Sequence, residues 1–177
     1  MRSEDIKYVI IQAGGKGIRM GRYAENKPKC LVPVKGIPMI MNTIEKYKDK
    51  EIIIIADYKA DVLEAYLTNF CKYNFTVCQT TEQGTAGGLA KVMDLIPDDE
   101  PFILTWADLF FEETPEFEFD KDLLVGLSDT FKCRWKLENN RFVNEASTEV
   151  GVAGFFAFRN KERFNKLSIS KSLVRGF

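Results

Sequence analysis

Four short apolar runs lie within the first 106 residues, and they constrain the fold more than any other feature of the sequence. They cover residues 8–13, 52–56, 75–79 and 102–106 and are rich in β-branched and aromatic side chains. Their apolarity is continuous rather than alternating, which is typical of strands that are covered on both faces in a parallel sheet. We therefore predict that the four runs form one buried sheet.

Helical patterns separate these runs. After Gly36, the segment IPMIMNTIEKYK begins with an early proline, and residues 61–70 and 85–96 repeat apolar side chains with a helical period. The apolar face of the second segment consists of Val62, Leu63, Tyr66, Leu67 and Phe70, and that of the third of Leu89, Val92, Met93 and Ile96. Alternating strands and helices predict a Rossmann-like, three-layer α/β/α sandwich with a mostly parallel central sheet. In such doubly wound sheets, ligands bind at the carboxyl ends of the strands where the strand order reverses.

The remainder of the chain is less regular. Residues 112–122 predict an acidic loop or an edge strand. Further strands are predicted for LLVGLS, CRWKLE, RFVNEA and VGVAGFFAF, and a short helix for KERFNKLS.

Composition and charge indicate one globular domain and exclude several partners. The chain has 177 residues, of which 45% are hydrophobic, and this length suits a single core. The formal net charge of -1 provides no overall field that would attract nucleic acid or an anionic membrane. We expect a single domain over residues 1–177 that binds neither nucleic acid nor a membrane.

The cysteine and histidine content limits the cellular compartment and the catalytic groups that we expect. The four cysteines form no C-x-x-C pair, and no apolar stretch follows basic residues at the N-terminus, so we expect a cytoplasmic protein with reduced thiols. The chain contains no histidine, which removes the usual acid or base at neutral pH and most zinc sites. Catalysis must therefore depend on Lys, Arg, Asp, Glu or Cys side chains, or on a metal-bound phosphate.

A glycine-rich, cationic loop, QAGGKGIRMG, follows the first predicted strand. Gly14, Gly15 and Gly17 allow backbone N–H groups to point inward and bind anionic oxygens. Between residues 16 and 29 only Glu25 is negative, whereas five side chains are positive: Lys16, Arg19, Arg22, Lys27 and Lys29. The alternative is a structural glycine turn with solvated cations, but the pattern favours a polyphosphate ligand.

Two common phosphate motifs do not fit this loop. The pattern G-x-G-x-x-G fails because Met20 occupies its last glycine position after Gly15 and Gly17. The pattern G-x-x-x-x-G-K-[ST] occurs nowhere in the chain. A Rossmann dehydrogenase and a P-loop NTPase are therefore disfavoured.

Five segments resemble a known family in their sequence and order. The pair AGGKGIRM and KPKCLVPVKGIPMI resembles the N-terminal motif of the nucleotidyltransferases, which include sugar-1-phosphate pyrophosphorylases and phosphocholine cytidylyltransferases. QTTEQGTAGGLA resembles the base-binding segment of that family, and WADLFF resembles its strand end with a metal-binding aspartate. EVGVAGFFAF resembles its later glycine-aromatic strand. The resemblance implies a GT-A-like nucleotidyltransferase fold and a role in sugar-nucleotide biosynthesis.

The reaction that this resemblance implies explains the residue types. In that reaction, a phosphate oxygen of a phosphorylated metabolite attacks the α-phosphorus of an NTP in line, and pyrophosphate departs. The attacking oxygen is already anionic, so the absence of histidine is harmless. Repulsion between anions favours Arg, Lys, backbone N–H groups and Mg²⁺, which we expect as the cofactor.

The resemblance also implies the sites of the NTP. The triphosphate would lie in a backbone cradle formed by Ala13, Gly14, Gly15, Lys16, Gly17 and Ile18. Gln79 would read the base together with Gly84 and Thr85, and this arrangement favours a pyrimidine nucleotide. The alternative for Thr85 is the start of a helix, and the two readings are compatible.

Catalytic and acceptor residues follow from the same comparison. Arg19 would stabilise the transferring phosphoryl group and the pyrophosphate, and Lys29 would hold the acceptor phosphate or the α-phosphate. Asp108 would bind Mg²⁺. Glu145 and Gly154 would contact the acceptor. The alternatives are a surface lysine for Lys29 and a helix N-cap for Asp108.

The sequence departs from the family pattern at several positions. Gln12 replaces an aliphatic residue, Ile18 replaces a threonine, and Ala107 replaces the glycine before the metal-binding aspartate. The family also takes a second metal ligand from a strand further along, whereas this chain ends at Phe177. We therefore expect a nucleotidyltransferase domain that is incomplete at its C-terminal end.

The acceptor stays open at this stage. A sugar-1-phosphate is the leading candidate. Phosphocholine, with CTP, is the alternative, because aromatic side chains near the site could stack on a quaternary ammonium, namely Trp106, Phe110, Phe111 and Trp135. A non-catalytic, nucleotide-sugar-binding regulatory subunit with the same fold is a third possibility, and a homo-oligomer is left open.

Overall fold

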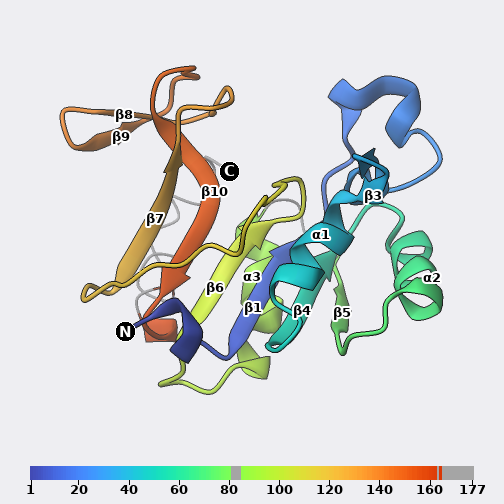
Figure 1. Cartoon of the computed structure of the whole chain (residues 1–177), viewed down its shortest axis with the longest axis horizontal. Helices are drawn as coiled ribbons and strands as arrows, with labels where there is room; N and C mark the ends of the chain where they lie inside the picture. The colour runs from blue at the N-terminus through green and yellow to red at the C-terminus, as the bar shows by residue number, and fades with distance from the viewer. Residues whose placement is uncertain (81–84, 163, 165–177) are drawn as a thin grey trace.

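A mixed, mostly parallel sheet forms the centre of the molecule (Figure 1). The computed structural model of the chain describes residues 1–80, 85–162 and 164. The strand order of the main sheet is β5-β4-β1-β6-β10-β8-β9, and β7 pairs with β10. This architecture confirms the predicted fold class.

The four apolar runs form the parallel part of this sheet. They are β1 (Tyr8–Gln12), β4 (Glu51–Ala56), β5 (Thr76–Gln79) and β6 (Phe102–Trp106). In the centre, Ile10 pairs with Ile53 of β4 on one side and with Leu104 of β6 on the other. The chain therefore extends the sheet in one direction from β1 to β5 and then crosses to the other side of β1. The strand order reverses between β1 and β6, where a ligand site is expected.

Antiparallel strands complete the sheet beyond β6. β10 (Gly151–Phe158) pairs with β6, and β7 (Leu123–Ser128) pairs with β10 across a bulge between Val152 and Phe156. β8 (Lys136–Glu138) and β9 (Arg141–Val143) form a short hairpin beside β10. Residues 112–122 form no strand and make only an isolated bridge from Glu118 to Arg2, so the loop alternative is correct.

Three α-helices lie where helical patterns were predicted. They are α1 (Met39–Lys46), α2 (Ala60–Phe70) and α3 (Thr85–Val92), and the 3-10 turn η4 (Met93–Leu95) continues α3. α1 begins later than the pattern suggested, because Ile37 and Pro38 form β3, which pairs with β2 (Pro33–Val34). Three more 3-10 turns are η1 (Ser3–Asp5), η2 (Ile18–Ala24) and η3 (Lys29–Leu31). None of the helices in the described ranges is long and apolar enough to span a bilayer.

The helices cover both faces of the sheet, which explains the continuous apolar runs. α1 and α2 pack on the face of Val9, Ile11 and Ile54, whereas α3 packs on the face of Ile10 and Ile55. Successive strand residues therefore enter two separate cores. The prediction that Phe70 lies on the buried face of α2 is wrong. Its side chain, at the last residue of the helix, is exposed and contacts Tyr66.

The stability of the sheet should depend on its central strands. Ile54 is fully buried in β4, so we expect Ile54→Ala to lower the free energy of unfolding by about 2–5 kcal/mol through lost burial and the cavity left behind. Ile37, which is 48% exposed in β3, is the matched control, and Ile37→Ala should change this free energy by no more than about 0.5 kcal/mol. Urea denaturation followed by circular dichroism measures both values, and equal effects would contradict the assigned core.

Candidate active site

The glycine-rich loop leaves the sheet at the predicted position, between the carboxyl ends of β4 and β6. The backbone N–H of Ala13 donates to the carbonyl of Ile55 at 2.8 Å, and the N–H of Ala107 donates to the carbonyl of Gln12 at 3.0 Å. These bonds hold the start of the loop next to the ends of both neighbouring strands. Figure 1 shows the loop between β1 and β3 standing beyond this edge of the sheet.

Close contacts limit the space at two of the four glycines in the loop. Gly17 has φ 64° and ψ 31°, in the left-handed region, and a Cβ added there would lie 2.9 Å from the Cβ of Lys29. A Cβ at Gly14 would lie 3.1 Å from the Cβ of Asp57. At Gly15 no described atom lies within 4 Å of an added Cβ, so its backbone faces open space. The same holds for Gly21, so Gly15 and Gly21 are the glycines of this loop that border open space.

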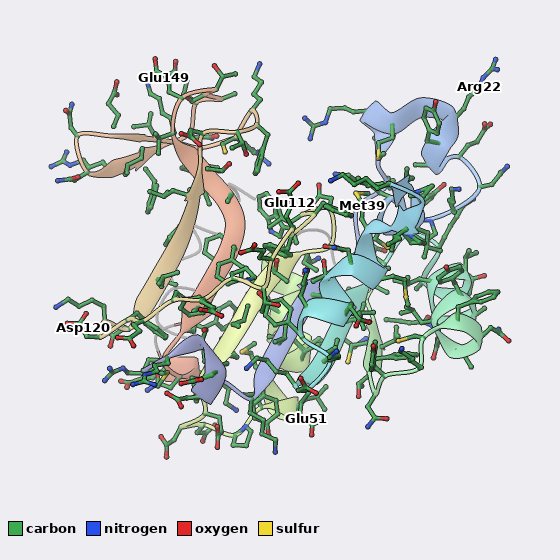
Figure 2. All side chains as sticks on the ribbon, viewed as in Figure 1. Arg22, Met39, Glu51, Glu112, Asp120 and Glu149 are labelled. Carbon is green, nitrogen blue, oxygen red and sulfur yellow. The ribbon has the colours of Figure 1, made fainter. Side chains whose placement is uncertain are left out.

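An open pocket of about 490 Å³ lies between the turn η2 and the start of the loop. A break at Gly21, with φ 51° and ψ -129°, bends η2 around it. The pocket is lined by Lys16, Gly17, Ile18, Gly21, Arg22, Ala24, Glu25 and Tyr58. Figure 2 shows Arg22 at the tip of the loop, pointing away from the sheet. Two cations, Lys16 and Arg22, and one carboxylate, that of Glu25, line this volume together with glycine backbone, and the excess of positive charge favours an anionic ligand.

The connection between β4 and α2 supports this loop, and sequence reasoning missed it. Lys59 Nζ donates to the backbone carbonyl of Glu25 at 2.7 Å, and the Tyr58 hydroxyl donates to the same oxygen at 3.4 Å. Lys59 itself has φ 53°, a left-handed conformation that is uncommon for a residue with a side chain. The position of residues 57–59 could have indicated this contact. They directly follow a predicted strand, so they lie at the same carboxyl edge of the sheet as the glycine-rich loop.

Two predicted catalytic residues meet beside the loop. Lys29 lies in η3, directly after Pro28, and its ammonium forms an ion pair with the carboxylate of Asp108, which follows β6. The two side chains are 29% and 33% exposed. Residues 109–122 contain no helix, so the N-cap alternative for Asp108 is wrong. The surface alternative for Lys29 is also wrong, since its side chain is half-buried and paired.

The remaining cations of the loop are available to a ligand. Arg19 and Lys16 are exposed, and neither forms an ion pair with another residue of the described chain. Ile18, which replaces the threonine of the family, is 85% exposed. The site therefore combines free positive charge, open backbone and one neutralised carboxylate.

Other predicted residues lie further from this cluster or outside the described residues. The Gln79 side chain donates to Glu64 of α2 at 2.8 Å, and Glu145 pairs with Lys136 at 2.9 Å. Thr85 is the first residue of α3, as its alternative reading predicted, whereas Gly84 lies outside the described residues. The roles of these four residues stay predictions.

Gly154 and the aromatic residues differ in their surroundings. Gly154 has φ 87°, and any Cβ there would clash with the indole of Trp106, so glycine is required for β10 to pass this ring. The ring of Phe111 is partly buried and packs against the core, with its centroid 6.4 Å from that of Tyr47. Phe110 lies under the ammonium of Lys35, 5.7 Å from the ring centroid. Phe111 is therefore partly occupied by contacts with the core.

Sequence comparison identifies the family that carries these motifs. The profile of the MobA-like NTP transferase domain matches residues 9–115. The bifunctional protein GlmU of Methanocaldococcus jannaschii is 32% identical over 111 residues, which are 60% of this chain and 26% of that protein. The glucose-1-phosphate cytidylyltransferase of Salmonella typhimurium is 27% identical over 153 residues, which are 69% of this chain and 60% of that protein. The chain spans less than two thirds of the length of these curated relatives.

Solved structures agree on the fold. The CTP:phosphocholine cytidylyltransferase of Streptococcus pneumoniae superposes with a TM-score of 0.72 at 21% sequence identity. The superposition covers 97% of this chain and 79% of that one. This likeness confirms the predicted nucleotidyltransferase fold.

Gly17 should be needed for the shape of the loop. We expect Gly17→Ala to weaken binding of a non-hydrolysable NTP analogue by at least about tenfold, because left-handed strain of about 1–3 kcal/mol and the contact with Lys29 both displace the loop. Gly36, with φ 84° but no described atom near an added Cβ, is the matched control. Gly36→Ala should leave the affinity for the analogue within about twofold of wild type. Isothermal titration calorimetry measures both, and equal affinities of the two variants would refute the role of Gly17.

Cys30, next to Lys29, should not react in the folded protein. Burial raises the pKa of its thiol to about 12, so almost no thiolate exists at pH 8. We expect iodoacetamide at pH 8 to alkylate the half-buried Cys71 and Cys78 well before Cys30, which should react only after unfolding. Mass spectrometry of tryptic peptides measures each site, and early labelling of Cys30 would contradict its burial.

Proposed function

The chain belongs to the MobA-like NTP transferase domain family, and from this premise we propose that it transfers a nucleoside monophosphate from an NTP to a sugar-1-phosphate and releases pyrophosphate. The observation that carries the proposal is the meeting of Lys29 and Asp108 beside an open, cationic glycine loop at the point of strand reversal. The name of the Salmonella relative, a glucose-1-phosphate cytidylyltransferase, supports this acceptor class. The proposed role is the synthesis of sugar nucleotides.

The reaction needs charge and position rather than proton transfer. A phosphate oxygen of the acceptor forms the new bond to the α-phosphorus, and the bond from that phosphorus to the bridging oxygen of the β-phosphate breaks. Pyrophosphate leaves with the bonding electron pair. No proton must be removed from the nucleophile, so a site without histidine is sufficient. The protein contributes by orienting two anions and by stabilising the charge of the transition state.

The cations of the loop are suited to these tasks. The backbone of the cradle from Ala13 to Ile18 would hold the triphosphate, with Gly15 the position most open to it. Arg19 would contact the transferring phosphoryl group and the pyrophosphate through its planar guanidinium. Lys29 would hold the acceptor phosphate or the α-phosphate as a mobile point charge.

Mg²⁺ fits the donor set when it is bound together with the nucleotide. Asp108 offers a hard carboxylate at the strand end, but the described residues contain no group of three side chains that could hold a metal ion by themselves. Mg²⁺ sites commonly combine one or two carboxylates with phosphate oxygens and waters. Asp108 would hold the ion against the triphosphate, and when bound the ion would neutralise charge on the α-phosphate and the leaving group.

A pyrimidine nucleotide is the proposed donor. The cytidylyl group in the name of the Salmonella relative and the CTP in the name of the Streptococcus enzyme support this choice. The amide of Gln79 offers a donor and an acceptor to the base, with Gly84 and Thr85 beside it in sequence. In the structure this amide donates to Glu64, so reading a base requires it to exchange that hydrogen bond.

The alternative acceptor and the non-catalytic reading are less well supported. Phe111 packs against the core, and Lys35 already covers the ring of Phe110, where its charge would repel a quaternary ammonium. Arg19, Lys29 and Asp108 are all retained, which favours an enzyme over a regulatory subunit. We further propose a cytoplasmic protein whose residues 1–177 form one nucleotidyltransferase domain, and its four free cysteines are consistent with a reducing compartment.

Pyrophosphate release tests the function. We expect the chain with Mg²⁺, one NTP and one sugar-1-phosphate to release pyrophosphate, with CTP or another pyrimidine nucleotide most active in a panel of NTPs and acceptors. A coupled phosphate assay after pyrophosphatase measures the rate. The absence of release from every pair would refute the enzymatic proposal, and release with phosphocholine alone would replace the acceptor.

Two variants test the assigned roles. Arg19→Ala and Asp108→Asn should each lower kcat/KM by at least about 100-fold, the usual effect of removing one group that stabilises transition-state charge. The matched controls are Arg141→Ala and Asp120→Asn, at exposed positions far along the chain in β9 and the acidic loop, and they should stay within about twofold of wild type. Urea midpoints verify folding, and wild-type rates in Arg19→Ala or Asp108→Asn would refute the corresponding role.

A further inference from the structure

We propose that Lys29 neutralises Asp108 in the ligand-free protein and thereby makes divalent-cation binding depend on the triphosphate. The inference rests on the proposed function and adds an order of assembly to it. The protein alone would bind the cation weakly, whereas the nucleotide would both displace Lys29 and supply the missing ligands.

The first step of the argument is the contact itself. The ammonium of Lys29 lies on one carboxylate oxygen of Asp108, although the residues are 79 positions apart in the chain. Both side chains are about two-thirds shielded from solvent, where attraction between charges is stronger than on an open surface. The pair is therefore the resting arrangement of the site.

The backbone on both sides holds this pair in place. On the side of Lys29, its carbonyl accepts from the N–H of Val32 at 3.0 Å, and the next residue, Cys30, is 2% exposed. On the side of Asp108, Ala107 is 3% exposed and bonded to β1. The Cα positions are thus fixed by the core, and the side chains are free to change partners.

The second step concerns the cation. Mg²⁺ gives up its water reluctantly and needs several oxygen ligands. Within the described residues Asp108 is not part of any group of three side chains that could bind a metal, and its charge is already cancelled by Lys29. A divalent cation that approaches this carboxylate also meets the like charge of the ammonium at short range. The ligand-free site should therefore bind the cation weakly.

The third step is the effect of the triphosphate. Its oxygens provide additional ligands for the cation, and its negative charge offers Lys29 new partners. A lysine ammonium on a flexible four-carbon stem can move between acceptors without a change in the backbone. Once Lys29 turns to the phosphates, Asp108 is free to bind the cation. Nucleotide and cation then strengthen each other's binding by the same factor.

Binding of Mn²⁺ to the ligand-free protein is the first test. We expect the full chain alone to bind Mn²⁺ weakly and Lys29→Met to bind it at least about tenfold more tightly, because a like charge within a few Å has been removed. Electron paramagnetic resonance of free Mn²⁺ measures the affinity without turnover. Lys29→Arg keeps the ion pair and should behave as wild type, and the double variant Lys29→Met/Asp108→Asn should lose the gain.

A matched control separates this effect from a general change in charge. Lys35 also pairs with a carboxylate, that of Glu112 at 3.4 Å, but both side chains are highly exposed. Lys35→Met should leave the affinity for Mn²⁺ within about twofold of wild type, since exposed charges are strongly screened. A gain equal to that of Lys29→Met would overturn the proposal, as would an unchanged affinity in Lys29→Met. Circular dichroism shows whether each variant is folded.

The coupling between cation and nucleotide is the second test. A non-hydrolysable CTP analogue should raise the affinity of the wild-type protein for Mn²⁺ by at least about 100-fold, within the usual range of coupling between sites. In Lys29→Met this factor should fall by at least about tenfold, because Asp108 no longer has to be released. An unchanged factor would overturn the proposal. Both tests use binding alone, so they can succeed or fail independently of pyrophosphate release.

Discussion

The pairing of β1 with strands on both of its sides is the constraint on which the rest of the structure depends. β1 is buried on both faces and bonded in parallel to β4 and β6, so its last residues can leave the sheet only at one edge. The backbone hydrogen bonds donated by Ala13 and Ala107 continue the strand pairing beyond the last residues of β1 and β6. The glycine loop and Asp108 are therefore brought together by the same backbone ladder that builds the core.

Charge, rather than acid and base chemistry, characterises the site that results. The loop places free cations beside open backbone, and the carboxylate of Asp108 next to it is neutralised by Lys29. Such an arrangement suits the joining of two anions, whose mutual repulsion is the main barrier. The same ion pair gives the site a resting state in which neither charge is left partly buried and unpaired.

Much of the fold and part of the site could be predicted from the sequence, for identifiable reasons. Continuous apolar runs correctly predicted the parallel strands because burial on both faces leaves few alternatives. The prediction that Phe70 belongs to the buried face of α2 was wrong, because periodicity does not show where the neighbouring layer ends. Phe111 was considered for ligand stacking, yet it packs against Tyr47, since an aromatic residue near a strand end can enter either the core or the site. The partners of Gln79 and Glu145 depend on long side chains that can reach several neighbours, which no local pattern specifies.

The sequence by itself determined the class of sheet, the order of strands and helices, and the presence of a glycine loop with surplus positive charge. These properties depend on local periodicity and on residue type, which a single chain shows directly. Only the tertiary structure decided that Lys29 contacts Asp108, that Gly17 must be glycine to lie against Lys29, and that residues 57–59 support the loop. These are contacts between segments far apart in the chain, and their geometry depends on how the whole sheet packs.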